Sequence, residues 1–330
     1  MSTQRSPQHP IGSGFSARTT AKEALDGIDL GGRLAVVTGG YSGLGLETTR
    51  ALAEAGAHVV VPARRRATAE DATAAISADT AGSVEVDELD LADLDSVRAF
   101  ADRFLASGRG IDIMIDNAAI MASPETRVGP GWEAQFATNH LGHFALVNRL
   151  WPAIADGDGA RVVSVSSRGH HRSPIRWDDV HFARGYDKWE AYGQAKTANA
   201  LFAVHLDALG RDHGVRAFSL HPGGILTPLQ RHIPKEEKVA LGWIDEDGNV
   251  VNPRFKTPEQ GAATQVWAAT SPQLSGMGGV YCEDCDIAEA VETGDASTPS
   301  RVRTYAVDPH EAARLWQLSA ELTGVDAFAR

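Results

Sequence analysis

The sequence contains only two cysteines, Cys282 and Cys285, among its 330 residues. Two cysteines are too few for a disulfide framework, so we expect a protein of a reducing compartment, the cytoplasm. The chain also lacks any run approaching the roughly 18 consecutive apolar residues of a membrane span. Its first thirty residues hold no apolar stretch suited to a signal-peptide core. These absences argue against secreted disulfide scaffolds and membrane-embedded proteins.

Basic residues are outnumbered, with 31 Lys and Arg against 43 Asp and Glu and a formal net charge of −12. This balance argues against binding to a nucleic-acid backbone as the main task. The charge is unevenly spread, because residues 79–95 carry seven acids and no Lys or Arg, whereas 64–66 are three arginines. A local anion site is therefore compatible with the negative total.

Two patterns resemble metal sites but lack a full set of ligands. The spacing Cys282-x-x-Cys285 has no second cysteine pair to complete a zinc site, so we interpret it as an acidic surface loop at a strand end. His140 and His143 lie three residues apart on a predicted helix, where core packing or a supporting contact explains them more simply. The sequence therefore predicts no metal.

After Gly32, short apolar runs alternate with longer segments of helical pattern. Apolar strands that are each followed by a helix are typical of a parallel sheet covered on both faces, and right-handed crossovers make it doubly wound. We predict an α/β fold with a single doubly wound parallel sheet of about seven strands and helices on both faces. The predicted strands are 34–37, 58–61, 84–86, 113–115, 161–165, 215–220 and 279–281. The predicted helices are 43–55, two that begin near 68 and 93, 131–154, 188–209, 257–270 and 309–322.

The predicted organisation is one domain with additions. Residues 1–30 form an N-terminal tail, flexible to about residue 18, and a short helix that Thr20 begins with capping-box spacing. Residues 31–330 form the single catalytic domain. Within it, residues 224–256 are interpreted as a lid over a substrate pocket, and residues 309–322 as a C-terminal helix.

A glycine-rich turn, TGGYSGLG at 38–45, connects the first predicted strand to the first predicted helix. Glycines allow the backbone to approach a pyrophosphate, and the helix N-terminus supplies N–H donors and a positive dipole. About 20 residues further on, an NAD site usually carries an acid, whereas this chain has Ala63 followed by Arg64. Arginine pairs with a 2′-phosphate that an acid would repel, so the sequence favours NADP(H) over NAD(H). Arg65 and Arg66 are interpreted as a solvated helix start.

Tyr192 and Lys196 lie four residues apart, on one face of a predicted helix. An ammonium one turn away favours the phenolate, so we expect Lys196 to lower the pKa of Tyr192 from its usual value near ~10. Ser167 follows a predicted strand, at the edge where parallel sheets position reactive groups. Its hydroxyl is suited to hydrogen-bonding a carbonyl oxygen that the tyrosine protonates.

Four motifs, in this order, resemble the short-chain dehydrogenase/reductase family over roughly residues 30–285. They are TGxxxGxG at 38–45, DNAA at 116–119, YxxxK at 192–196 and PGxxxT at 222–227. The step from Ser167 to Tyr192 and the HLGHF run at 140–144 are similar to the branch of retinol dehydrogenases and protochlorophyllide reductases, with its uncharacterised bacterial oxidoreductases. Asp116 and Ala119 depart from the more usual Asn and Gly of the second motif.

The resemblance implies a Rossmann fold and a catalytic tetrad. The tetrad residues are Asn139, Ser167, Tyr192 and Lys196. By the same resemblance Asn139 holds the water of a proton relay, Lys196 also binds the nicotinamide ribose, and Ile225 and Thr227 contact the carboxamide. The residues expected to bind cofactor are Gly39, Ser42, Gly43, Leu44, Gly45, Arg64, Asp90, Leu91, Asn117, Ala118, Tyr192, Lys196, Pro222, Gly223, Ile225 and Thr227.

We therefore predict an NADP(H)-dependent oxidoreductase that interconverts a carbonyl and an alcohol by hydride transfer, with Tyr192 as acid/base. The alternative is a catalytically silent NADP(H)-binding sensor or scaffold, which would need Gly43 and Arg64 but not Tyr192 with Ser167. The predicted partner is a small apolar carbonyl or alcohol, because the lid is rich in apolar residues and Trp177 and Trp189 precede the tyrosine. No nucleic acid or membrane is expected, and the resemblance implies oligomers built on the long helices.

Overall fold

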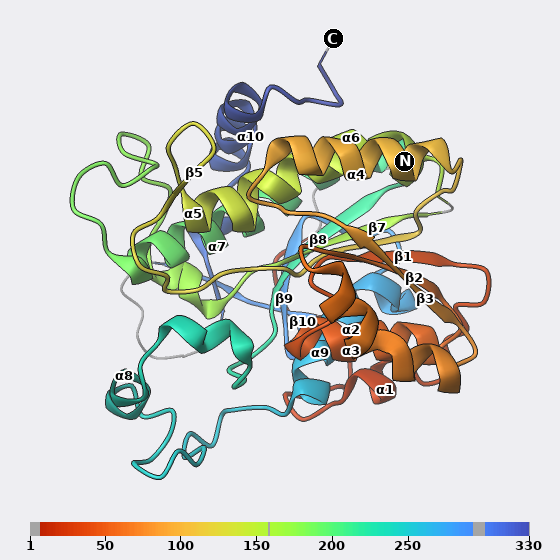
Figure 1. Ribbon diagram of the computed structural model, residues 1–330, viewed down its shortest axis with the longest axis horizontal. Coiled ribbons are helices and arrows are strands. Elements are labelled where there is room, and N and C mark those ends of the chain that lie inside the picture. Colours follow the sequence, from red (N-terminus) through yellow and green to blue (C-terminus); the bar gives the residue numbers. More distant parts are fainter. Residues whose placement is uncertain (1–6, 158, 293–300, 330) are drawn as a thin grey trace.

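The computed structural model describes residues 7–157, 159–292 and 301–329. Its main sheet has eight strands in the order β10-β9-β8-β7-β4-β1-β2-β3 (Figure 1). Seven of them pair in parallel, which confirms the predicted sheet, and β10 is added antiparallel to β9 at one edge. The strands are β1 Leu34–Val37, β2 His58–Ala63, β3 Ser83–Glu88, β4 Ile113–Asp116, β7 Arg161–Val165, β8 Arg216–His221, β9 Val280–Glu283 and β10 Asp286–Ile287.

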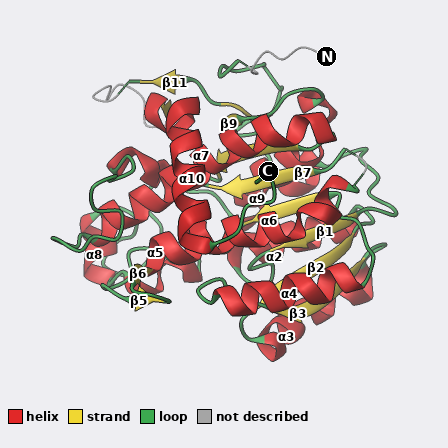
Figure 2. Ribbon diagram, turned by 90° about the horizontal axis from the view of Figure 1, so that it is seen from above, coloured by secondary structure: helices red, strands yellow, loops and turns green. Residues whose placement is uncertain are grey.

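Helices cover both faces of this sheet (Figure 2). In β1 the side chains alternate, since Ala35 and Val37 pack with Leu52 of one helical layer and Val36 packs with Phe144 of the other. This burial on both faces explains why the strands are almost continuously apolar. The first layer holds α1 Ala21–Ala24, α2 Gly43–Glu54, α3 Arg66–Asp79 and α9 Pro258–Thr270; the second holds α4 Leu94–Ala106, α6 Gly142–Ala155, α7 Lys188–Gly210 and α10 Pro309–Thr323.

The chain reverses its winding direction at β1. From β1 the chain winds outward through β2 and β3 and then crosses back to β4, on the other side of β1. In such sheets the ligand crevice lies at the carboxyl ends of the strands, at this switch point. The fold therefore places the glycine turn after β1 at the position where a ligand is expected.

The predicted helix 131–154 is interrupted at its start. Its first residues form β6 (Trp132–Glu133), paired with β5 (Arg127–Val128), and then α5 (Ala134–Phe136). A π-helical turn, Ala137–Leu141, leads into α6. Such turns occur often at functional sites, and this one contains Asn139.

The N-terminal segment and the two cysteines differ from their interpretation as a flexible tail and a surface loop. Residues 8–13 lie along β9 and β10: the side chain of Gln8 donates to the carbonyls of Tyr281 and Ala288, and Asp286 accepts from three backbone N–H groups. Cys282 and Cys285 are free but buried, packed with residues of α9 and the N-terminal segment. Their interpretation as a surface loop is wrong, because the strand and the turn after it lie beneath these elements.

The C-terminal helix α10 packs on the long helices. Trp316 stacks on Phe202 of α7, with ring centroids 5.8 Å apart, and meets Phe144 of α6 edge-on at 4.8 Å. Ser319 of α10 contacts buried His140, with 2.7 Å between Oγ and Nε2, which confirms a core position for that histidine. Part of the surface that the resemblance assigned to subunit contacts is thus covered by the chain itself.

Candidate active site

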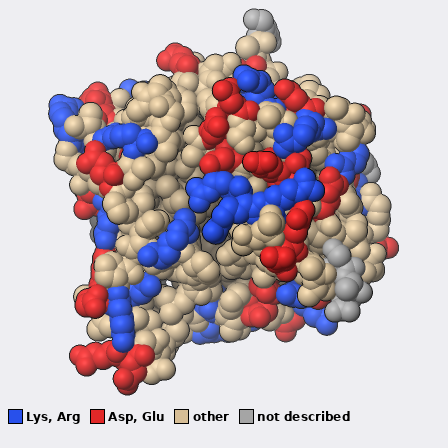
Figure 3. Space-filling view, in the orientation of Figure 1, with Lys and Arg blue, Asp and Glu red and all other residues tan. Residues whose placement is uncertain are grey.

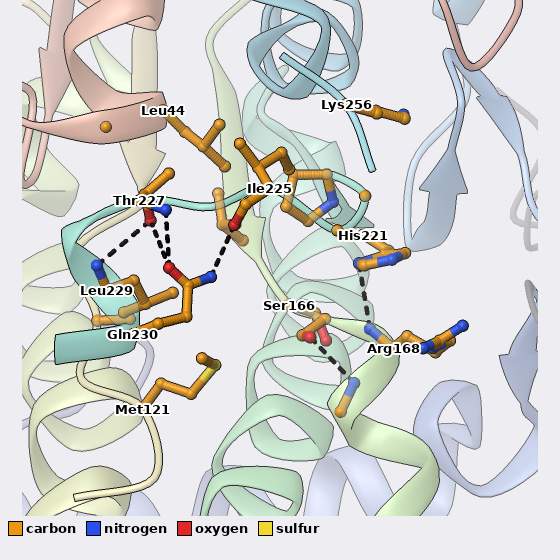
Figure 4. A pocket seen from close by; sticks show the side chains of 18 of the residues that line it. Leu44, Met121, Ser166, Arg168, His221, Ile225, Thr227, Leu229, Gln230 and Lys256 are labelled. Carbon is orange, nitrogen blue, oxygen red and sulfur yellow. Dashed lines mark hydrogen bonds between the residues drawn. The ribbon is translucent and has the colours of Figure 1, made fainter. Parts of the chain in front are cut away.

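A cavity of about 1100 Å³ opens at the carboxyl ends of the strands. Its walls come from the β1–α2 turn, the segments after β2, β4, β7, β8 and β9, the start of α7, and residues 222–231 and 252–256 (Figure 4). Every segment that the sequence assigned to the cofactor or to the reaction contributes to it, except those that carry Asp90, Leu91 and Asn139. The sheet therefore brings together motifs that are up to about 190 residues apart in the chain.

The glycine turn leaves room for a ligand close to the backbone. Gly39 has φ +65°, and a Cβ on Gly45 would overlap its carbonyl oxygen, so neither position tolerates a side chain without rearrangement. Ser42 makes no side-chain cap at the start of α2, so the first N–H groups of this helix face the cavity without a side-chain acceptor. This cradle fits a pyrophosphate.

The hydroxyl of Thr38 joins the two strands that flank the crevice. It accepts hydrogen bonds from the backbone N–H groups of Asn117 (2.9 Å) and Ala118 (3.0 Å), which follow β4. Burial lowers the pKa of His143 to about 4, so its ring is neutral. Because His143 Nδ1 faces the Asn139 carbonyl at 3.0 Å, Nδ1 carries the proton, and Nε2 accepts from Thr38 at 2.9 Å.

Asn139 fixes the chain that follows β4. Its side-chain amide accepts from the N–H of Ile120 and donates to the carbonyl of the same residue, both at 2.9 Å. The side chain is fully buried and lies outside the cavity lining. It therefore positions the wall that contains Met121.

Ser167, Tyr192 and Lys196 lie together at the cavity wall. Ser167 Oγ accepts from Gly169 N at 2.9 Å, and the Ser167 side chain favours a lower pKa of Tyr192. Lys196 Nζ donates to the Val165 carbonyl at 2.7 Å and lies 5.8 Å from the centroid of the tyrosine ring. Both α7 side chains are almost wholly buried.

Burial dominates the protonation of this pair. It raises the pKa of Tyr192 to about 12, against a smaller lowering by the hydrogen bond with Ser167. It also lowers the pKa of Lys196 to about 7. The expected net lowering of the tyrosine pKa is therefore wrong for the chain alone, because burial of the hydroxyl dominates.

The cavity lining includes most of the expected cofactor residues. Arg64 is among them, and Arg65, which the sequence assigned to a solvated helix start, lines the cavity as well; Arg66 instead pairs with Glu70 at 2.8 Å. The expected residues in the lining are Gly39, Ser42, Gly43, Leu44, Gly45, Arg64, Asn117, Ala118, Tyr192, Lys196, Pro222, Gly223, Ile225 and Thr227.

Asp90 and Leu91 do not line the cavity. A carboxylate oxygen of Asp90 accepts from the N–H of Ala92. Leu91 is buried, and its carbonyl oxygen packs closely against Gly142 at the start of α6. The expectation that these two residues border the adenine stays a prediction. They follow β3, which is separated from β1 and its glycine turn by β2.

Several polar residues of the lining were not expected from the sequence. Arg168 follows Ser167, His221 ends β8, and Glu283 ends β9, so all three lie at the edge of the sheet that carries the site. Their position at strand ends was a usable signal. Lys256 carried no such signal, because it reaches the cavity from the segment before α9, where its Nζ pairs with Asp284 at 2.6 Å.

Asp116 lies behind the site. It is buried, and neither carboxylate oxygen has a hydrogen-bond partner among the described residues. Burial raises the pKa of this carboxyl well above its usual value. The departure from the usual asparagine thus introduces an acid where the surroundings favour an uncharged group.

The described residues hold no cluster of three or more His, Cys, Asp or Glu with the geometry of a metal site. None of the helices that these residues form combines the length and apolarity that a bilayer crossing requires.

A doubly wound sheet with a glycine cradle and a buried Tyr–Lys pair defines a nucleotide-binding oxidoreductase of the Rossmann class. A sequence model described as short chain dehydrogenase matches residues 33–238. The chain belongs to the short-chain dehydrogenase/reductase family.

Its relatives include a "Probable oxidoreductase" of Streptomyces lividans, 49% identical over 298 residues, which span 89% of this chain and 98% of that protein. Retinol dehydrogenase 12 of Mus musculus is 36% identical, over 90% of this chain and 88% of that protein. Among solved structures, the NADP complex of Pseudomonas aeruginosa RhlG is 25% identical, covers 77% of this chain and 95% of that chain, and has a TM-score of 0.60.

We expect Asp116→Asn to stabilise the protein at pH 7 by about 1–3 kcal/mol, because an amide avoids burying a carboxylate. A carboxyl with a raised folded pKa contributes stability at low pH that is lost as the pH rises above its unfolded value of about 3.9. The gain should therefore shrink as the pH falls towards 4. Urea unfolding at several pH values measures both effects.

Asp112→Asn is the matched control, because Asp112 is not fully buried and pairs with Arg33 at 2.7 Å. It should not stabilise the protein at pH 7. Equal effects of the two substitutions would contradict the explanation from burial.

Proposed function

We propose that this protein is an NADP(H)-dependent oxidoreductase that interconverts a carbonyl and an alcohol. The observation that carries the proposal is the meeting of Ser167, Tyr192 and Lys196 at the wall of a cavity that also contains the glycine cradle. A sensor or scaffold would need the cradle alone. A buried tyrosine and a serine that line the same cavity as this cradle favour the enzyme.

In the direction of reduction, Tyr192 gives its proton to the carbonyl oxygen of the substrate. The hydroxyl of Ser167 hydrogen-bonds the same oxygen and polarises the carbonyl. A raised pKa keeps the tyrosine protonated and ready to act as an acid. The bound nicotinamide cofactor supplies the hydride in reduction and accepts it in oxidation.

Lys196 supports the tyrosine from one turn away. Its hydrogen bond to the Val165 carbonyl holds the ammonium behind Ser167, where a positive charge favours the phenolate that forms when the proton leaves. We also propose that Lys196 binds the nicotinamide ribose. Asn139 supports the site through Ile120, and its contact with a relay water stays a prediction.

The chain offers separate places for the parts of the cofactor. We propose that the turn at 39–45 holds the pyrophosphate, that Asn117 and Ala118 flank the ribose, and that Ile225 and Thr227 contact the carboxamide. Arg64, with Arg65 beside it, is proposed to bind the 2′-phosphate and so to select NADP(H). The NADP complex of the RhlG structure supports this choice.

One wall of the cavity is apolar. Met121, Trp189, Leu229 and Trp243 line it, and Trp189 meets Trp243 edge-on at 6.1 Å. We propose that the apolar part of the substrate lies on this wall. Trp177, also considered from the sequence, donates instead to Glu311 of α10 and is absent from the lining.

We propose that residues 224–256 act as a lid. Their helix α8 (Lys235–Ala240) is attached to α7 through Glu237, which accepts from Lys188 Nζ at 2.6 Å and from Trp189 Nε1 at 2.9 Å. Near the C-terminal end of the lid, Arg18 of the N-terminal segment donates to the carbonyls of Pro253 and Phe255. The lid is thus held in its middle and near one end by elements outside it.

We also propose the cytoplasm as the place of action, because two free, buried cysteines suit a reducing compartment.

Tyr192→Phe is expected to lower kcat by about 10²–10⁴-fold, because it removes the acid/base hydroxyl and leaves the ring in place. NADPH oxidation with a panel of ketones, aldehydes and quinones measures turnover, and calorimetry measures NADPH binding, which should change little. Turnover within roughly tenfold of the native value would refute the role of the tyrosine. If no member of the panel is reduced by the native protein, the sensor alternative is favoured.

Arg64→Ala is expected to raise the KM for NADPH by about tenfold to a hundredfold and to leave the KM for NADH nearly unchanged, because only NADPH carries the 2′-phosphate. Steady-state kinetics with both cofactors provide the comparison. Arg66→Ala is the matched control, since Arg66 lies outside the cavity lining. An equal effect of Arg64→Ala on both cofactors would contradict the assignment.

Glu237→Gln is expected to raise the KM for the carbonyl substrates roughly three- to tenfold, because the charge-assisted hydrogen bonds that hold the lid are weakened. The neighbouring Glu236 is exposed, and Glu236→Gln serves as the control. The two variants are compared in the same substrate panel. If they behave alike, Glu237 does not hold the lid.

A further inference from the structure

The side chains that line the cavity are mostly cationic, whereas the chain as a whole is negatively charged. The protein carries a net charge of −12, yet Glu283 and Asp284 are the only acidic side chains among the described residues of the lining, and the other charged ones are cationic. Figure 3 shows Lys and Arg gathered across the centre of one face of the molecule. Arg64 and Arg65 are accounted for by the proposed 2′-phosphate site. The remaining cations are more than a pyrophosphate requires.

Two polar residues of the lining, Arg168 and His221, lie across the cavity from part of the apolar wall. In Figure 4, Met121 and Leu229 lie on one side of Ser166, and Arg168 and His221 lie on the other. Ser166, the chain neighbour of Ser167, thus lies between two sides of different chemistry. A substrate that contacts both has an apolar part and an anionic part.

Two arginines of the lining, Arg168 and Arg172, make no hydrogen bond or ion pair through the guanidinium with a described residue. The guanidinium of Arg168 makes no hydrogen bond or ion pair with a described residue, although the backbone N–H of this residue donates to His221. The guanidinium of Arg172 lies 5.0 Å from the centroid of the Trp189 ring, at the border with the apolar wall. By contrast, Lys256 is paired with Asp284, and Arg303 donates to the Glu292 carbonyl.

Both arginines belong to one short helical turn, Arg168–Arg172, that begins directly after Ser167. Buried His170 anchors this turn: its Nδ1–H donates to the Ser167 carbonyl at 2.6 Å, and its Nε2 accepts from Arg303 N at 3.1 Å. The Tyr305 hydroxyl donates to the His170 carbonyl at 2.6 Å. The backbone that carries the two guanidinium groups is therefore ordered before a ligand arrives, which lowers the entropic cost of binding.

We infer that the substrate is an aldehyde or ketone, or the corresponding alcohol, whose apolar body carries a carboxylate, and that Arg168 and Arg172 bind this carboxylate. The planar guanidinium group matches a carboxylate through two parallel hydrogen bonds. The inference rests on the proposed function and deepens it. It makes Arg168 and Arg172 specificity-determining residues, while Ser167 and Tyr192 act on the carbonyl.

The test compares ω-oxo carboxylates of increasing chain length with their methyl esters, as substrates for NADPH-dependent reduction. The native enzyme should prefer the acid of suitable length over its ester by about tenfold or more in kcat/KM, and added salt should reduce this preference. Arg168→Met and Arg172→Met should each lower kcat/KM for the acid by about tenfold to a hundredfold and leave the ester within about twofold.

Two controls separate this effect from general changes. Arg98→Met removes the same charge from an exposed position on helix α4, outside the lining, and should leave the acid-to-ester ratio unchanged. Arg172→Lys retains a charge without the planar fork, so it should keep part of the preference and also covers the case in which Arg172→Met fails to fold. The affinity for NADPH should be the same in all variants.

The outcomes distinguish this inference from the proposed function. If the native enzyme reduces acids and esters equally well, or if the ratio is unchanged in Arg168→Met and Arg172→Met, the carboxylate site is refuted and the reductase stands. If no compound is reduced, the proposed function fails with these probes, and calorimetry with the NADP⁺-saturated protein decides the inference. Tighter binding of the acid than of the ester, lost in Arg168→Met, supports it, and equal binding overturns it.

Discussion

The hydroxyl of Thr38 is one buried oxygen that joins three parts of the fold. It receives N–H groups from the segment after β4 and donates to neutral His143, whose other nitrogen donates to the Asn139 carbonyl. The end of β1, the end of β4 and the π-helical turn are thus held in one arrangement. A charged His143 would have no lone pair for the hydroxyl, so the low pKa that burial imposes is a condition of this arrangement.

The rest of the site depends on that junction. Asn139, placed by it, holds Ile120, and the chain then continues into Met121 on the apolar wall of the cavity. On the other side, the glycine turn begins one residue after Thr38. A single set of buried hydrogen bonds therefore fixes both the cofactor cradle and one wall of the substrate space, although neither Thr38 nor His143 lines the cavity.

Sequence patterns predicted the parts of the structure that local rules govern. The parallel strands were predictable because both of their faces are buried, and the capping box at Thr20 forms as its spacing indicates. The start of the 131–154 segment was not, because Glu133 caps a new short helix and a two-residue strand precedes it. Two-residue strands such as β10 are too short to show a recognisable alternation of apolar and polar residues.

The site was predicted unevenly for a similar reason. The motif residues are contiguous or regularly spaced, so they can be recognised from the sequence alone. Lys256 and Arg172 reach the cavity only because the fold returns them to it, and the burial of Cys282 results from an N-terminal segment more than 250 residues away. The direction of the Tyr192 pKa depends on how much solvent the folded chain excludes, and spacing along a helix does not contain that information.

The position of α10 has a consequence for how this fold behaves on dilution. A surface covered by a second subunit is exposed when the protein concentration falls below the dissociation constant, since association costs translational and rotational freedom. Trp316 is tethered to Phe144 and Phe202 by the chain itself, so its packing has no such concentration dependence. On that face, the long helices remain shielded from water in a single molecule at any dilution.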